Sequence, residues 1–256
     1  MYKVYFVGCG PGDPDLITVK AKKLLSKADV VVYSGSLIPQ QILKICKKAK
    51  LYDASGLVRE EIFEILKNNA QKNKLVIRLH DGDPAIYGAI REQTDNLKKE
   101  GIVCEIVPGV TSFLASSAAL GLQLTLPGVT QTIIITRAEK RTKVPQQERI
   151  SELAKHKSTM IFYLSVHLLS DIVKEAIKGG YSKSTPVAIV YKASWPDQKI
   201  ITGTLEDIVK KVWAEKITKT AIVMIGDVIQ PKSYEYSKLY DKTFSHGFRK
   251  AKKNLQ

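Results

Sequence analysis

Short apolar runs rich in β-branched residues alternate with helical stretches along this chain of 256 residues, and no other feature constrains its fold as strongly. The strand-like runs cover residues 4–7, 29–33, 75–79 and 103–107, then residues 132–136, 159–164, 187–191 and 221–225. The helical stretches cover residues 16–27, 40–48, 59–69, 89–99, 111–120, 168–178 and 205–215. Such alternation predicts an α/β protein whose mostly parallel sheets carry helices on both faces.

The turn-rich residues 121–128, which include Pro127, form the strongest candidate for a domain junction. The chain is long enough for two domains of about 120 residues. We therefore predict an N-terminal α/β domain over residues 1–120 and a C-terminal α/β domain over residues 121–230. Residues 231–256 are polar and basic and carry several tyrosines, which predicts an extended tail.

A glycine loop, Gly8-x-Gly10-x-Gly12, follows the first predicted strand and precedes a helix. A dinucleotide-binding loop would carry a third glycine three residues after the second, where this chain has Asp13. A carboxylate there would repel a pyrophosphate at the helix N-terminus, so NAD binding is disfavoured. Asp13 or Asp15 suits a helix cap instead, and the glycines let a flat ligand approach the backbone.

Two further loops follow predicted strands, where ligands of open α/β sheets bind. The first is Asp81-Gly82-Asp83-Pro84, and its alternative interpretation is a helix N-cap with proline in the first turn. The second runs over residues 107–112. Its Thr111 or Ser112 can either cap the next helix or donate a hydrogen bond to a ligand.

Cysteines and histidines give no sign of a metal site. The three cysteines lie far apart without a CxxC pair, which disfavours a disulfide framework and a structural zinc. The four histidines are equally scattered. We expect no bound metal.

Charge and hydropathy limit the partners. The net charge is +15, but the lysines cluster on predicted helices and in the tail, which favours a solvated surface over a nucleic-acid partner. No run of about 18 apolar residues is present, so we expect no membrane span. Residues 1–7 run directly into glycines, unlike a signal peptide, and a cytoplasmic location is expected.

Taken in order, the loops resemble those of the tetrapyrrole (corrin/porphyrin) methylase family over residues 1 to about 230. The matching stretches are GCGPGDPDLIT at 8–18, RLHDGDPAIYG at 78–88, VPGVTS at 107–112 and a Leu-Pro pair at 126–127. The resemblance implies two α/β domains of the class III methyltransferase type, with the active site in the cleft between them. It also implies a homodimer and S-adenosyl-L-methionine as the cofactor.

Within that family the chain most resembles the branch that methylates carbon 11 of precorrin-4, or of its cobalt form, in cobalamin biosynthesis. The stretches that indicate this branch are YSGSLI at 33–38, YGAIREQ at 87–93, SKLYD at 237–241 and FSHGFR at 244–249. The alternatives are methylation of uroporphyrinogen III, of another corrin carbon, of a modified histidine or of ribosomal RNA. A non-catalytic tetrapyrrole-binding protein is an alternative from another class.

The resemblance also implies the residues of the site. The cofactor contacts fall on Pro11, Asp81, Gly82, Asp83, Ile86, Thr111, Ser112, Leu164 and Ala193. Leu164 stands where sister enzymes often have methionine, and an apolar role should survive that change. The candidates for moving a proton are Asp13, Asp83 and Tyr87, with none preferred. Arg91 and Arg137 are predicted to pair with carboxylates of the substrate, although Arg91 also suits an exposed helix position.

Overall fold

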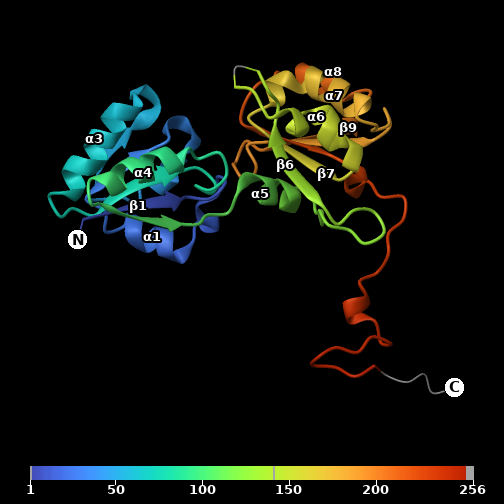
Figure 1. Cartoon of the computed structure of the whole chain (residues 1–256), viewed down its shortest axis with the longest axis horizontal. Coiled ribbons are helices and arrows are strands. Elements are labelled where there is room, and N and C mark those ends of the chain that lie inside the picture. Colours follow the sequence, from blue (N-terminus) through green and yellow to red (C-terminus); the bar gives the residue numbers. More distant parts are fainter. Residues whose placement is uncertain (1, 141, 252–256) are drawn as a thin grey trace. The chain divides into compact units, whose positions relative to one another are not determined.

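The chain forms two compact units in a computed structural model that describes residues 2–140 and 142–251 (Figure 1). One unit combines Met1–Ala119 with the short segment Tyr191–Lys199, and the other combines Leu120–Val190 with Ile200–Gln256. The end of the predicted tail, residues 252–256, lies outside the described residues. The boundaries that we drew at 120 and 230 stay predictions.

The first unit is built on a five-stranded sheet with the order β3-β2-β4-β1-β5. Every pair of neighbouring strands in it is parallel. Its strands are β1 (Lys3–Gly8), β2 (Val30–Tyr33), β3 (Lys50–Asp53), β4 (Val76–His80) and β5 (Val103–Val107).

The chain connections leave the neighbouring strands β1 and β4 in opposite directions. From β1 the chain runs to β2, toward one end of the strand order, whereas from β4 it runs to β5 at the other end. The register aligns Gly8 with His80 and Val7 with Val107, so all three strands end at the same edge. Ligands of open α/β sheets bind at such a switch point, outside the carboxyl ends of the strands.

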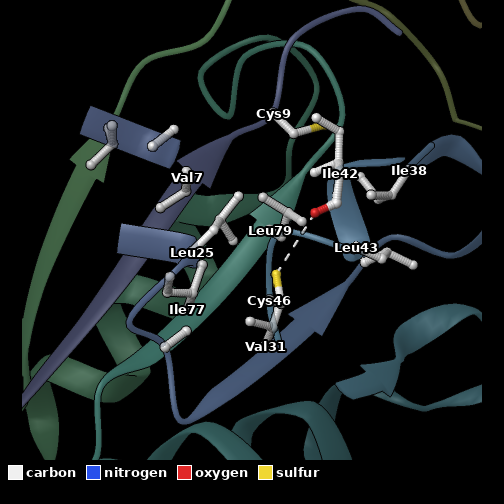
Figure 2. Packing of buried hydrophobic residues seen from close by; sticks show 13 residues of the cluster. Val7, Cys9, Leu25, Val31, Ile38, Ile42, Leu43, Cys46, Ile77 and Leu79 are labelled. Carbon is white, nitrogen blue, oxygen red and sulfur yellow. Dashed lines mark hydrogen bonds between the residues drawn. The ribbon is translucent and has the colours of Figure 1, made fainter. Parts of the chain in front are cut away.

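Helices cover both faces of this sheet, as predicted. Side chains alternate along each strand, so Val7 and Val31 reach one core while Phe6 and Val32 reach the other. Figure 2 shows the first core, where α1 and α2 meet the sheet; α3 and α4 pack in the second. The helices are α1 (Val19–Leu25), α2 (Gln40–Leu43), α3 (Arg59–Ala70), α4 (Ile90–Lys99) and α5 (Ser112–Ala119).

The second unit contains a five-stranded sheet with the order β6-β7-β10-β8-β9. This sheet is mixed, because β7 pairs parallel with β6 but antiparallel with β10. Its strands are β6 (Ile133–Arg137), β7 (Thr159–Tyr163), β8 (Pro186–Tyr191), β9 (Lys199–Thr204) and β10 (Ala221–Ile225). Its helices are α6 (Ile150–Leu153), α7 (Leu169–Lys178) and α8 (Ile208–Ala214).

The tail after β10 forms short local structure. Arg249 organises part of it, since one guanidinium nitrogen donates to the backbone carbonyls of Leu239 and Asp241, each at 2.7 Å. Large side chains in this segment remain exposed, among them Tyr236, Tyr240 and Phe248. Within the described residues, no helix has the length and apolar character needed to cross a membrane.

Candidate functional site

The loops after β1 and β4 are joined by backbone hydrogen bonds at the carboxyl edge of the first sheet. Gly10 and Gly82 exchange two bonds, with the N–H of Gly82 at 2.8 Å from the oxygen of Gly10 and the reverse bond at 3.2 Å. The N–H of Cys9 also donates to the carbonyl of His80 at 2.9 Å. The structure therefore brings the first two family motifs together.

Asp83 ties the third loop to the second. Its Oδ2 accepts from the N–H of Gly109 at 2.9 Å, and its Oδ1 accepts from the N–H of Ala85 at 2.8 Å. A Cβ on Gly109 would overlap the carbonyl oxygen of Gly82 and lie 2.9 Å from the carbonyl carbon of Gly8. Glycine is required where these backbones approach so closely.

Gly82, Thr111 and Ser112 lie against one another in this cluster. Gly82 has a φ of +56°, and a Cβ built on it would lie 3.7 Å from the backbone nitrogen and Oγ of Ser112 and from Cα of Thr111. Thr111 is buried. Ile86 follows within the same turn, and its N–H donates to the carbonyl of Asp83 at 3.2 Å. Gly82, Asp83, Ile86, Thr111 and Ser112, all predicted cofactor residues, thus belong to one group of loops.

Tyr87 lies just beyond, with a left-handed φ of 56° and an exposed ring. Ala89 is left-handed as well. Such conformations are unfavourable for residues with side chains and are often found at functional sites.

A segment from far along the sequence contributes to this unit. The N–H of Asp13 donates to Oγ of Ser194 at 2.9 Å, and the indole N–H of Trp195 donates to the carbonyl of Pro11 at 2.8 Å. The predicted cofactor residue Pro11 therefore accepts one of these bonds, and the predicted Ala193 precedes Ser194 in the chain. Sequence reasoning missed Ser194 and Trp195, since each bond spans more than 180 residues and no local pattern announces it.

Beneath the second loop lies a buried arginine. Arg78 donates through Nη1 to the carbonyls of Val32 and Leu79, each at 3.2 Å, and through Nε to Gln93 at 3.3 Å. Burial lowers the pKa of Arg78 to about 10, which leaves it charged at neutral pH. It therefore links the end of β2, strand β4 and helix α4.

Burial also shifts the pKa values of His80 and Asp81, which follow Arg78 in the chain. Loss of hydration, together with the smaller effect of the charge of Arg78, lowers the pKa of His80 to about 3. Nε2 of His80 is buried and without a hydrogen-bond partner among the described residues. The imidazole stacks on the ring of Phe6, with 6.0 Å between the two ring centres. Burial also raises the pKa of Asp81, although the charge of Arg78 opposes that shift. The imidazole is thus neutral at physiological pH.

The two predicted substrate arginines differ in their surroundings. Arg91 pairs with Asp95 one turn along α4 at 2.7 Å, and its side chain is 89% exposed. In the second unit, Arg137 donates to the backbone carbonyls of Thr142 at 3.0 Å and Lys143 at 3.2 Å. Arg91 therefore occupies the exposed helix position that was the alternative prediction for it. A substrate role for either arginine stays a prediction.

Arg137 and Leu164 line one concave surface of the second unit. Its volume is about 480 Å³, and Lys140 and His167 border it as well. Leu164 is 65% exposed and has a left-handed φ of 54°, an unusual setting for a large apolar residue. The structure thus brings a predicted cofactor residue together with a predicted substrate residue within this unit.

Metal ligands do not gather in the part of the chain that the structure describes: it holds no group of three or more His, Cys, Asp or Glu side chains suited to an ion. Cys9 and Cys46 are free thiols in the core drawn in Figure 2. Burial raises the pKa of Cys9 to about 12 and that of Cys46 to about 11, so both stay protonated at neutral pH.

Glycine-lined loops at a switch point of a parallel sheet define a class of α/β proteins that bind a ligand against their backbone. The model of the tetrapyrrole (corrin/porphyrin) methylases matches residues 3–209 of this chain. The chain belongs to that family, and the family and the α/β fold predicted from the sequence are confirmed.

Curated relatives match along nearly the whole chain. A cobalt-precorrin-4 C(11)-methyltransferase of Methanocaldococcus jannaschii is 52% identical, covering 99% of this chain and 98% of its own. A cobalt-precorrin-4 C(11)-methyltransferase of Priestia megaterium is 48% identical, covering 98% of this chain and 99% of its own.

Solved structures agree in fold. The X-ray structure of a cobalt precorrin-4 methyltransferase, a cobalamin biosynthetic enzyme, has a TM-score of 0.87 and 47% identity, covering 90% of this chain and 96% of its own. The uroporphyrin-III C-methyltransferase of Thermus thermophilus, complexed with S-adenosylhomocysteine, has a TM-score of 0.76 and 31% identity. That match covers 89% of this chain and 99% of the other.

Proposed function

We propose that this chain transfers a methyl group from S-adenosylmethionine to carbon 11 of precorrin-4, or of cobalt-precorrin-4, in cobalamin biosynthesis. The observation that carries the proposal is 52% identity over nearly the full length to an enzyme named for that reaction. Identity to a uroporphyrinogen-III C-methyltransferase of Bacillus subtilis is 34%, which favours the carbon-11 branch over that alternative.

The three loops of the first unit suit S-adenosylmethionine. Gly109 lets the three loops pack closely, because a side chain there would collide with the carbonyl oxygen of Gly82, and Gly82 has a left-handed φ of +56° that favours glycine. Ser112 offers a hydroxyl group beside Gly82, Thr111 precedes it in the same loop, and Asp81 offers a carboxylate. Leu164 of the second unit is exposed and stays a predicted cofactor contact.

Bound there, S-adenosylmethionine supplies a sulfonium methyl that is already activated for transfer. The protein then has to hold the cofactor and the ring carbon in line and to keep water away. Pro11, Gly82 and Ala193 would hold the cofactor through backbone and shape.

The three candidates for moving a proton, Asp13, Asp83 and Tyr87, differ in their surroundings. Both carboxylate oxygens of Asp83 already accept backbone N–H groups, which suits holding two loops together better than accepting a proton. Asp13 accepts the N–H of Asp15 through one oxygen, and Tyr87 presents an exposed ring. We therefore place Asp83 among the residues that shape the site and keep Asp13 and Tyr87 as candidates for moving a proton.

The proposed substrate carries several carboxylates, and basic residues border the concave surface of the second unit. Arg137, Lys140 and His167 lie there beside Leu164. Charge attraction toward such a patch accelerates encounter with an anionic ligand. The proposal further includes a homodimer, as the family resemblance implies. From the charge and hydropathy of the sequence it includes a cytoplasmic location without a nucleic-acid or membrane partner.

The test is methyl transfer by the purified protein to precorrin-4, cobalt-precorrin-4 and uroporphyrinogen III, followed by mass spectrometry and NMR of the product. We expect one added methyl at carbon 11 of one or both corrin precursors. Methylation of uroporphyrinogen III alone would support the alternative within the family. Tetrapyrrole binding without any methyl transfer would support a carrier.

A further inference from the structure

The segment Tyr191–Lys199 packs on the first glycine loop of the same unit. Trp195 and Ser194 bond the backbone on both sides of Gly12, through the carbonyl of Pro11 at 2.8 Å and the N–H of Asp13 at 2.9 Å. A Cβ on Gly12 would overlap Cδ1 of Trp195 and lie 2.9 Å from its Cγ. The indole therefore rests directly on the α-carbon of Gly12.

The segment is itself held in shape. Nζ of Lys192 pairs with Asp197 at 2.6 Å and lies 5.2 Å from the centre of the Trp195 ring. The N–H of Ser194 donates to Oε1 of Gln198 at 2.7 Å. Lys192 and Ser194 both have left-handed backbones, with φ of 47° and 68°. Such conformations persist where surrounding contacts enforce them, so the segment presents the indole in a fixed orientation.

The glycine loop is thereby held from two directions. Gly10 is bonded to Gly82 of the second loop, whereas the stretch from Pro11 to Asp13 is bonded to the Trp195 segment. Without the second attachment Gly12 would give this stretch wide backbone freedom. Ordering a free loop upon binding lowers affinity, and a loop that is already ordered avoids that cost.

We propose that Trp195 and Ser194 are positioning residues that hold the loop from Pro11 to Asp13 in the geometry that binds the cofactor. The inference rests on the proposed function, because it assigns the loop to S-adenosylmethionine. Neither residue needs to touch the cofactor. Their effect is on binding more than on the transfer step, since the loop holds the cofactor and does not react.

Three variants test the role: Trp195→Ala, Trp195→Phe and Ser194→Ala. We expect Trp195→Ala to raise the Kd for S-adenosylhomocysteine and the KM for S-adenosylmethionine by about tenfold or more, with kcat changed far less. Trp195→Phe keeps a ring over Gly12 but loses the bond to Pro11, so it should recover part of the affinity. Trp213→Phe is the matched control, since this exposed tryptophan of the second unit should leave Kd unchanged.

Fluorescence gives a separate readout. The chain has two tryptophans, so a Trp213→Phe protein reports on Trp195 alone. We expect its emission to change as S-adenosylhomocysteine is titrated in. If Trp195 acted only in packing, Trp195→Ala would have a lower melting temperature but an unchanged KM. The emission of Trp195 in the Trp213→Phe protein would then not change during the titration.

The outcomes separate the two proposals. Wild-type affinity in both Trp195→Ala and Ser194→Ala, in a protein whose wild type binds S-adenosylhomocysteine, would overturn the positioning role and leave the proposed function standing. A folded wild type that does not bind would overturn the proposed function and the inference with it. If Trp195→Ala does not fold, Ser194→Ala and Trp195→Phe decide, since they preserve most of the packing.

Discussion

Asp83 joins two loops of the site through its carboxylate, and its removal gives the first prediction. Asp83→Ala leaves the partly buried N–H of Gly109 without its acceptor, at a cost of about 1–3 kcal/mol, whereas water can replace the exposed bond to Ala85. We expect calorimetry to show affinity for S-adenosylhomocysteine at least about tenfold weaker. Asp95→Ala is the control, because the side chain of Asp95 is 40% exposed and pairs with Arg91 of the same helix. Unchanged affinity in Asp83→Ala would remove this loop from the site.

The close approach of backbones at Gly109 gives the second prediction. Gly109→Ala forces a Cβ into the carbonyl of Gly82, and we expect it to lower the free energy of unfolding by more than about 2 kcal/mol. Gly56→Ala is the matched control, since a Cβ there meets nothing within 4 Å, and it should stay within about 0.5 kcal/mol of wild type. Equal stability of the two variants in urea unfolding would contradict the packing described for the three loops.

Sequence reasoning at the scale of single residues succeeded where motifs are local and stopped where contacts are distant. Gly82, Thr111 and Ser112 come from two motifs, and the parallel register of the sheet brings them together. Ser194 and Trp195 escaped because their partners lie across more than 180 residues of sequence. Whether the predicted residues contact the cofactor stays a prediction.

Strand β4 carries the third prediction, on pH. The pKa of His80 is about 3 in the folded chain, against about 6.5 in an unfolded one. Since the folded pKa is the lower, the unfolded chain takes up a proton first as pH falls. His80 therefore contributes no loss of stability above about pH 6.5 and a growing loss from there toward pH 3.

Between pH 7 and pH 5 this loss amounts to about 2 kcal/mol of unfolding free energy. His80→Leu should lack it in urea unfolding, whereas His156→Gln, at an exposed site, should keep the wild-type pH dependence. An equal decrease in wild type and His80→Leu would show that His80 is not buried in its neutral form.

The predicted bounds of strands agreed with the structure where the strand is buried and its residues are apolar. Buried strands such as β10 fell within the predicted residues, while β3 and β9 were missed because they are largely exposed and lack an apolar run. The first helix was expected over 16–27 but occupies Val19–Leu25. Asp13 caps a short 3-10 turn at Pro14–Leu16, and Oγ1 of Thr18 then caps the helix itself.

At the scale of the whole molecule, the order of the motifs predicted the family, and the alternation of strands and helices predicted the α/β class. Helices on both faces of a parallel sheet follow directly from alternating apolar runs, as the first unit shows. The antiparallel partner of β7 could not be predicted, because a fully buried strand has the same pattern in either direction. The inclusion of residues 191–199 in the first unit depends on tertiary contacts alone.

The tail gives the fourth prediction. Its bonds are mainly local, as in the Arg249 contacts, and the three loops of the first unit lie elsewhere in the sequence. We expect a chain without residues 232–256 to keep its circular dichroism spectrum and most of its affinity for S-adenosylhomocysteine. Complete unfolding of the shortened chain would show that the tail belongs to the core.

Isothermal titration with S-adenosylhomocysteine measures whether the three loops hold S-adenosylmethionine. We expect saturable binding in the micromolar range, about −8 kcal/mol, that Asp83→Ala weakens. No detectable binding by the folded wild-type protein would show that the loops do not hold the cofactor.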